Sequence, residues 1–260
     1  MSVAEPPSLP RVLVFGHSHM VALVNAHKAE AAAGEARFDL VSYQFLRDDR
    51  QHITNVDGKW RYHPDCTREL LQLIAEIRPA LLVSMVQGEQ AISAGLVAPD
   101  RPFDFYFPGE EENGFGAVAE IVPFDQLFET CRREHQLLPE LLDELRPGMT
   151  VPALALSPPP PNSDAEFIFG KIVGHPGIAE HLARRGLPSS NWRYRMWKAH
   201  NFALRAIYEE HDLIFLDPPA EALGENRCLR QDFWWDVFHA NEDYGHLLLR
   251  QIAAFVPTGS

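Results

Sequence analysis

Short apolar runs alternate with helix-forming segments along this chain, and that alternation restricts the fold more than any other feature. Residues 11–15 form a β-branched, apolar run that ends at Gly16, and residues 18–32 after it have a helix-forming composition. Further strands are predicted at 38–45, 80–86, 152–156 and 213–216, and further helices at 67–77, capped by Thr67, at 124–145, kinked or divided at Pro139, and at 192–210 and 244–255. We therefore expect an α/β fold: a three-layer α/β/α sandwich with a central, mostly parallel five-stranded sheet.

The length of the chain suits one domain. A hydrophobic fraction of 46% over 260 residues is enough for a substantial core. We expect residues 1–260 to form this single domain, with residues 1–10 flexible. Residues 98–120 are rich in Pro, Gly, Phe and acidic residues, and we expect an irregular insertion there, near the site.

Net charge and cysteine content indicate which binding partners and which cellular compartment to expect. The formal net charge of −13 disfavours nucleic acid and anionic membrane surfaces. The three cysteines, Cys66, Cys131 and Cys228, form no CxxC pair, so a disulfide framework is not expected. The first residues have neither a basic nor an apolar leader region, and no stretch is apolar for long enough to span a bilayer. We expect a cytoplasmic protein that binds neither nucleic acid nor membrane, and the oligomeric state stays open.

Ser18 lies where the first predicted strand ends and the first helix begins. A serine at such a junction exposes its hydroxyl at the sheet edge, and its backbone N–H lies at a helix N-terminus, where unpaired amides can stabilise an oxyanion. The alternative is that Ser18 only caps the helix, which serine commonly does.

Asp236 and His239 lie three residues apart near the other end of the chain. This spacing lets both side chains turn to one side of a loop or helical turn, so the aspartate can orient the imidazole as a base. The alternative is a structural Asp/His pair in a Trp-rich, partly buried segment.

Residues 16–18 (Gly-His-Ser) and 236–239 (Asp-x-x-His) resemble the first and last blocks of the SGNH (GDSL-like) hydrolase superfamily. The likeness spans nearly the whole chain, and the Gly-His-Ser-His start resembles a divergent bacterial branch. It implies a flavodoxin-like SGNH fold, with Ser18 as nucleophile, His239 as general base and then acid, and Asp236 as the residue that holds the imidazole. It also implies an ester hydrolase without a cofactor or a catalytic metal.

The middle blocks of the superfamily are less well matched. The family has a Gly-x-Asn after its third strand, and Gly88-x-Gln90 aligns with it, so a glutamine amide would replace the asparagine in the oxyanion hole. A second register places Glu89 there, and a carboxylate would oppose an oxyanion. The family also has a glycine after its second strand, whose backbone N–H donates to the oxyanion hole. In this chain no glycine follows the second strand until Gly58, so a backbone N–H between residues 46 and 50 is the candidate for that donor.

His19 and Trp235 are further candidates for substrate binding. His19 lies on the first turn of the predicted helix after Ser18, and Trp235 immediately precedes the acid. The alternatives are a helix-start residue and a packing aromatic.

The resemblance implies hydrolysis of a short acyl ester, such as acetyl, on a small-molecule or glycan alcohol. Three alternatives stay open. They are an acyltransferase that uses the same triad, a non-catalytic glycan-binding or scaffold protein on this fold, and a metal-dependent hydrolase. The last would take its ligands from His17, His19, His52, His63 and Cys66.

Overall fold

The structure is a computed structural model that describes residues 9–45, 52–86, 88–109 and 120–257. Among these residues, five parallel strands form the central sheet in the order β2-β1-β5-β8-β9. The strands are β1 (Arg11–Gly16), β2 (Asp39–Gln44), β5 (Leu81–Met85), β8 (Ala153–Leu156) and β9 (Ile214–Leu216). The predicted fold class is confirmed.

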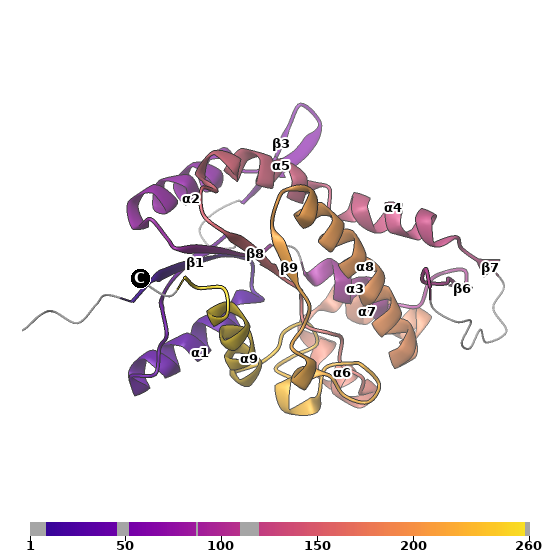
Figure 1. The fold of residues 1–260 in the computed structure, drawn as a ribbon. Helices are drawn as coiled ribbons and strands as arrows, with labels where there is room; N and C mark the ends of the chain where they lie inside the picture. The colour runs from indigo at the N-terminus through magenta and orange to yellow at the C-terminus, as the bar shows by residue number, and fades with distance from the viewer. Residues whose placement is uncertain (1–8, 46–51, 87, 110–119, 258–260) are drawn as a thin grey trace, which may run out of the picture.

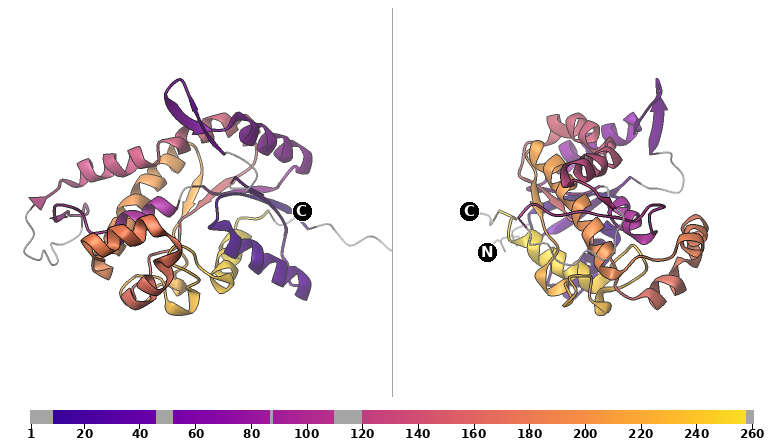
Figure 2. Two further views of the ribbon diagram at one scale, coloured as in Figure 1. Left: turned by 180° about the vertical axis from the view of Figure 1, so that it is seen from behind. Right: turned by 90° about the vertical axis from the view of Figure 1, so that its right-hand side faces the viewer.

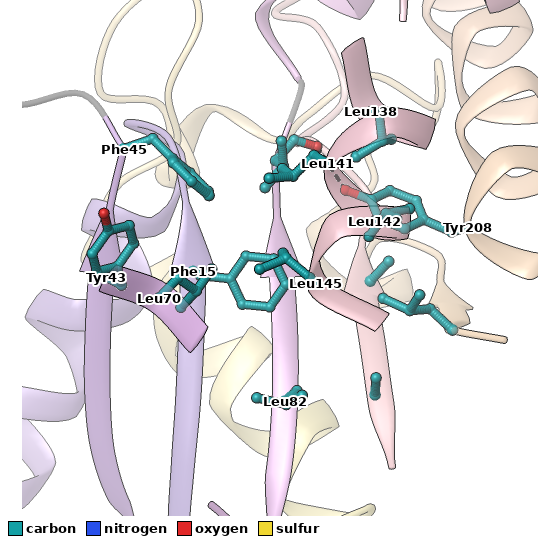
Figure 3. Close-up of a cluster of buried hydrophobic side chains, with 14 of the residues drawn as sticks. Phe15, Tyr43, Phe45, Leu70, Leu82, Leu138, Leu141, Leu142, Leu145 and Tyr208 are labelled. Atoms are coloured by element: carbon teal, nitrogen blue, oxygen red, sulfur yellow. Dashed lines mark hydrogen bonds between the residues drawn. The ribbon is translucent and has the colours of Figure 1, made fainter. Parts of the chain in front are cut away.

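Helices cover both faces of the sheet (Figure 1). Successive strand side chains point to opposite faces. Leu13 and Phe15 therefore pack with Leu82 into one buried cluster, while Val12 and Val14 pack into another. The first cluster is closed by α2 (Pro64–Ile77), α5 (Leu137–Leu145) and α8 (Ser190–Glu210), and the second by α1 (Met20–Ala33) and α9 (Glu242–Ala253). Figure 3 shows the first cluster, in which Leu145 of α5 lies next to Phe15 and the other α5 leucines lie toward Tyr208.

The remaining elements lie outside this three-layer centre. They are the hairpin β3 (Ile53–Val56) and β4 (Lys59–Tyr62), the short strands β6 (Phe103–Asp104) and β7 (Glu120–Ile121), and the helices α3 (Glu89–Leu96), α4 (Phe124–Glu134), α6 (Ala165–Lys171) and α7 (Pro176–Arg185). Short 3₁₀ turns occur at Arg146–Gly148, Ile172–Gly174, Ala220–Ala222 and Gln231–Phe233. The β3–β4 hairpin projects beyond the α2 and α5 layer (Figure 2). Its turn has positive φ at both Asp57 and Gly58, the geometry for which Asp-Gly is favoured.

Two details of the predicted helices are wrong. The helix α2 begins at Pro64, capped by His63, whose Nδ1 accepts from the backbone N–H of Asp65; Thr67 lies inside the helix. The division of the 124–145 segment falls at residues 135–136, between α4 and α5, and not at Pro139. Pro139 lies in the first turn of α5, where its missing N–H costs nothing because that N–H has no intrahelical acceptor.

Several expectations concern residues outside those described. Residues 1–8 of the predicted flexible start, residues 110–119 of the predicted insertion and the candidate second block at residues 46–50 are among them. Within the part of the chain that the structure describes, no helix has the length and apolar composition needed to cross a bilayer. The cytoplasmic location stays a prediction.

A close crossing of α1 and α9 brings the two ends of the chain together. A Cβ on Gly245 would lie 2.2 Å from the carbonyl oxygen of Ala22, so only glycine allows this approach. Because α1 follows Ser18 and α9 follows His239, the crossing positions the two predicted halves of the site side by side.

Candidate active site

The segment that carries Asp236 and His239 is a tight turn held by its own backbone. Trp234 and Ala240 form an antiparallel bridge, and the N–H groups of residues 235 and 236 both point to the carbonyl oxygen of His239, at 3.2 and 3.3 Å. The Asp236 carboxylate accepts the N–H of Phe238 at 2.8 Å and that of His239 at 2.7 Å. Aspartate favours such turns because its side chain bonds backbone two or three residues onward.

Three side chains from the two ends of the chain form one hydrogen-bonded row. His239 Nδ1 lies 2.9 Å from Asp236 Oδ2, and His239 Nε2 lies 2.7 Å from Ser18 Oγ. An ionised carboxylate only accepts hydrogen bonds, so Nδ1 carries the proton and Nε2 accepts from the serine hydroxyl. Burial alone would raise the pKa of Asp236, but the side chain and charge of His239, together with the two backbone N–H groups, hold that pKa below its usual value.

Ser18 lies in the turn between β1 and α1. The N–H of Met20 donates to His17 O at 3.2 Å, and the N–H of Val21 donates to Ser18 O at 3.0 Å. The N-cap of α1 is His19, which makes no side-chain cap, so the interpretation of Ser18 as a helix cap is wrong. Among the described residues, the backbone N–H groups of Ser18 and Gly88 have no hydrogen-bond acceptor.

Gly88 and His19 meet next to this row. A Cβ on Gly88 would lie 2.7 Å from His19 Cδ2 and 3.1 Å from Pro158 Cβ, so the close approach requires glycine. The His19 ring lies 5.0 Å from that of His239, centroid to centroid. Upstream of Gly88, the hydroxyl of Tyr208 in α8 donates to Val86 O at 2.8 Å and fixes the end of β5 (Figure 3).

His19 is a buried imidazole with both ring nitrogens unpartnered among the described residues. Burial, reinforced by the neighbouring His239 and His17, lowers the pKa of His19 to about 3. Leaving a buried polar group unpaired costs about 1–3 kcal/mol, and such groups in native structures are often functional. His19 is therefore a neutral side chain placed against the ring of His239.

Trp235 and Gln90, the other two predicted binding residues, lie in different positions relative to His239. Trp235 lies with its ring 5.9 Å from that of His239 and is 51% exposed. Gln90 is the second residue of α3, and no hydrogen bond joins its side chain to Ser18 or His239 among the described residues; its Oε1 is buried and unpartnered. His19 and Trp235 therefore contact His239 directly, Gly88 contacts His19, and no recorded contact joins the Gln90 side chain to Ser18 or His239.

Sequence reasoning missed Asn162 and Arg193. The Asn162 amide, directly after four prolines, donates to the backbone oxygen of Asp236 at 2.8 Å. Arg193 is only 2% exposed and donates to the carbonyl oxygens of Asn162 and Ser163, at 3.0 and 2.8 Å, and burial lowers its pKa. These bonds tie the turn at residues 234–240, which carries Asp236 and His239, to α8. No local signal marks them, because their partners are distant in the sequence.

Two histidines of the metal-dependent alternative, His17 and His52, lie with their ring centroids 5.9 Å apart. His17 Nε2 lies 3.2 Å from the Tyr62 hydroxyl, whereas His19 lies against His239. Over residues 9–45, 52–86, 88–109 and 120–257, no three His, Cys, Asp or Glu side chains are grouped so that they could hold a metal ion.

Four buried histidines make the stability of the fold depend on pH. Burial lowers the pKa of His17 and His200 to about 4, and that of His19 and His135 to about 3. Between the unfolded value of about 6.5 and these folded values, the unfolded chain binds protons that the folded chain does not. The stability that these neutral histidines contribute is therefore fully present above pH 6.5, and we expect the free energy of unfolding to fall as the pH drops from 6.5 toward 4. Urea unfolding at pH 7 and pH 5 measures this, and equal stability at both would contradict neutral burial.

No protein-family model and no curated protein sequence matches this chain. Its structure is similar to that of the periplasmic domain of a lipopolysaccharide acetyltransferase from Salmonella ser. Paratyphi A, with a TM-score of 0.53 and 12% identity over 96% of this chain and 84% of that one. A GDSL-like lipase from Bacteroides thetaiotaomicron gives a TM-score of 0.46 and 11% identity over 95% and 87% of the two chains. An extracellular lipase from Streptomyces rimosus gives a TM-score of 0.46 and 12% identity over 94% of this chain and 99% of that one. The similarity to the acetyltransferase domain shows a shared fold.

Proposed function

We propose that this chain is a serine ester hydrolase of the SGNH superfamily. The observation that carries the proposal is the hydrogen-bonded row from Ser18 Oγ through His239 to the Asp236 carboxylate. A serine hydroxyl is a weak nucleophile until a base removes its proton, and an oriented neutral imidazole is such a base.

The geometry supports an acyl-enzyme route. Ser18 Oγ attacks the ester carbonyl while His239 Nε2 takes the hydroxyl proton, and the imidazolium is stabilised by Asp236. The ester C–O bond then breaks, and His239 gives the proton to the leaving alcohol. A water molecule activated by His239 later attacks the acyl carbonyl, which releases the acid and restores Ser18.

The backbone N–H groups of Ser18 and Gly88 are the proposed oxyanion donors. Both lack an acceptor among the described residues, and each lies next to the start of a helix, α1 or α3, where amides carry partial positive charge. The Gln90 amide, at the second position of α3, stays a candidate for a third donor.

The acyl group in this proposal is short, and acetyl is the expected case. His19 and Pro158 pack directly on Gly88, which leaves little room beside the proposed oxyanion donors. The acceptor of the acyl group separates the two enzymatic alternatives. The shared fold with an acetyltransferase domain is the observation that favours transfer to an alcohol in place of water.

Covalent labelling tests the proposal. A fluorophosphonate probe should attach to Ser18, which peptide mass spectrometry would locate, and the purified protein should hydrolyse p-nitrophenyl acetate faster than p-nitrophenyl octanoate. Formation of an acetylated alcohol in place of acetate, when an alcohol acceptor is added, would identify a transferase. Absence of both labelling and turnover would leave the non-catalytic alternative.

A further inference from the structure

A cavity of about 310 Å³ lies along α8, the helix that packs beside the edge strand β9 (Figure 1). Its volume falls at the lower end of the range for small-molecule sites, which is about 300–1,000 Å³. The strands β5 and β8 separate β9 from β1, the strand that Ser18 follows. None of the described residues that line the cavity belongs to the row of Ser18, His239 and Asp236. The cavity is therefore separate from the proposed active site.

One face of α8 forms most of the cavity wall. The lining residues of this helix recur at spacings of three or four, so they lie on one side of it. They are Tyr194, Trp197, Lys198, Asn201, Phe202 and Arg205, and residues from the segment 217–223 after β9 complete the wall. The Tyr194 ring stacks on that of Trp197 at a centroid distance of 5.7 Å, and Phe202 is 40% exposed. Aromatic walls of this kind suit a flat ligand.

Two buried polar atoms of the lining residues have no partner among the described residues. Asn201 is 7% exposed and Trp197 is 5% exposed. The Asn201 amide donates to Trp197 O at 2.9 Å, which fixes its orientation because a carbonyl oxygen only accepts. Asn201 Oδ1 and Trp197 Nε1 are left unpaired. Leaving such groups unpaired is unfavourable, so an acceptor and a donor, one helical turn apart, are available to a ligand.

The charge of the cavity lining is opposite to that of the whole chain. Lys198 and Arg205 are two cations against the single carboxylate of Asp217 in the lining, whereas the chain has a net charge of −13. Arg205 Nη2 lies 2.6 Å from Asp217 Oδ1, and Lys198 Nζ lies 4.4 Å from the centroid of the Phe107 ring. The lining therefore attracts a small anionic group, although the charge of the whole chain opposes a nucleic-acid polymer.

We propose that this cavity binds a mononucleotide with an amino-substituted purine base. A ring nitrogen of the base accepts from the Trp197 indole N–H, and the exocyclic amino group donates to Asn201 Oδ1. The base stacks on the aromatic wall, and the phosphate lies toward the cations. An aromatic carboxylate would leave Asn201 Oδ1 unpaired, because a carboxylate has no donor. This site lies outside the esterase reaction, and every readout below is a binding measurement that does not depend on that reaction.

Titration calorimetry of the wild-type protein with four related compounds tests the ligand. AMP should bind most tightly. Purine riboside 5′-monophosphate lacks only the amino group and should bind about tenfold more weakly, because Asn201 Oδ1 stays unpaired. Adenosine, without the phosphate, should also bind more weakly, and ribose 5-phosphate should not bind detectably. Equal binding of AMP and ribose 5-phosphate would reveal only a phosphate held by the cations, and no binding of AMP at millimolar concentration would overturn the proposal.

Two variants test the residues. Trp197→Phe keeps an aromatic ring but removes the indole N–H, and it should weaken AMP binding by about tenfold. Trp192→Phe is the matched control, because Trp192 also lies on α8 with a buried indole nitrogen that is unpartnered among the described residues, yet its ring packs on Phe103 at 4.9 Å. Lys198→Gln should weaken binding of AMP more than that of adenosine.

An equal affinity for AMP in Trp197→Phe and Trp192→Phe would overturn the placement of the base. Thermal unfolding should show that both variants are folded. If Trp197→Phe does not fold, the comparison of AMP with purine riboside 5′-monophosphate on the wild-type protein decides the proposal, and equal affinity for these two compounds would overturn it.

Discussion

The Ser18→Ala variant is expected to lose ester hydrolysis by on the order of 10⁶ in kcat, the largest effect of any single substitution in this chain. The Ser18 hydroxyl is the group that His239 Nε2 contacts at 2.7 Å, and without it the acyl-enzyme cannot form. What remains is the modest acceleration that oxyanion donors and binding provide over water.

Initial rates with p-nitrophenyl acetate measure this loss, and fluorophosphonate labelling should vanish with it. Ser190→Ala is a suitable control, because Ser190 is the first residue of α8 and is not part of the row. Unfolding curves for both variants should overlay that of the wild type. Hydrolysis by Ser18→Ala at the wild-type rate would show that another group performs the chemistry.

The Asp236→Asn variant should lose about 10⁴ in kcat while it keeps its fold. The asparagine oxygen can still accept the backbone N–H groups of Phe238 and His239, so the turn is preserved. Its NH₂ group would then face His239 Nδ1 and force that nitrogen to accept. The imidazole proton would move to Nε2, which could no longer take the proton from Ser18.

We expect kcat to fall and KM to stay nearly unchanged, because the Asp236 side chain contacts the imidazole of His239 and not the substrate. Circular dichroism and urea unfolding should show that the structure is retained. Asp236→Ala provides the comparison, since it also removes the acceptor of the two turn N–H groups and should lower stability as well as activity. Activity of Asp236→Asn within tenfold of wild type would exclude Asp236 as the group that orients the base.

Much of the architecture could be predicted because it depends on local patterns. Apolar runs bounded by Gly and Pro predict buried parallel strands, and the five expected strands form the central sheet in the expected class of fold. The turn at residues 234–240 is also local, since the Asp236 carboxylate accepts from the N–H groups two and three residues onward. Such patterns do not determine helix boundaries, as His63 and Pro139 show, because a cap or a first-turn proline is tolerated at more than one position.

The exposure and hydrogen-bond partners of individual side chains could not be predicted in the same way. Trp234 and Trp235 are identical neighbours, yet one donates to Leu229 and the other is half exposed beside His239. Asn162 acts on a residue 74 positions away. Such contacts depend on how loops from different strands meet at the sheet edge, and a single sequence carries no signal for that.

The sequence by itself determined the α/β alternation, the serine at the end of the first strand and the Asp-x-x-His turn. Each follows from interactions within a few residues, where backbone geometry leaves few choices. Only the tertiary structure decided that Ser18 and His239, 221 positions apart, are in hydrogen-bond contact, and that Gly88 lies against His19. These outcomes depend on the strand order and on the α1–α9 crossing at Gly245, because a contact between distant segments exists only once the elements that carry them have packed.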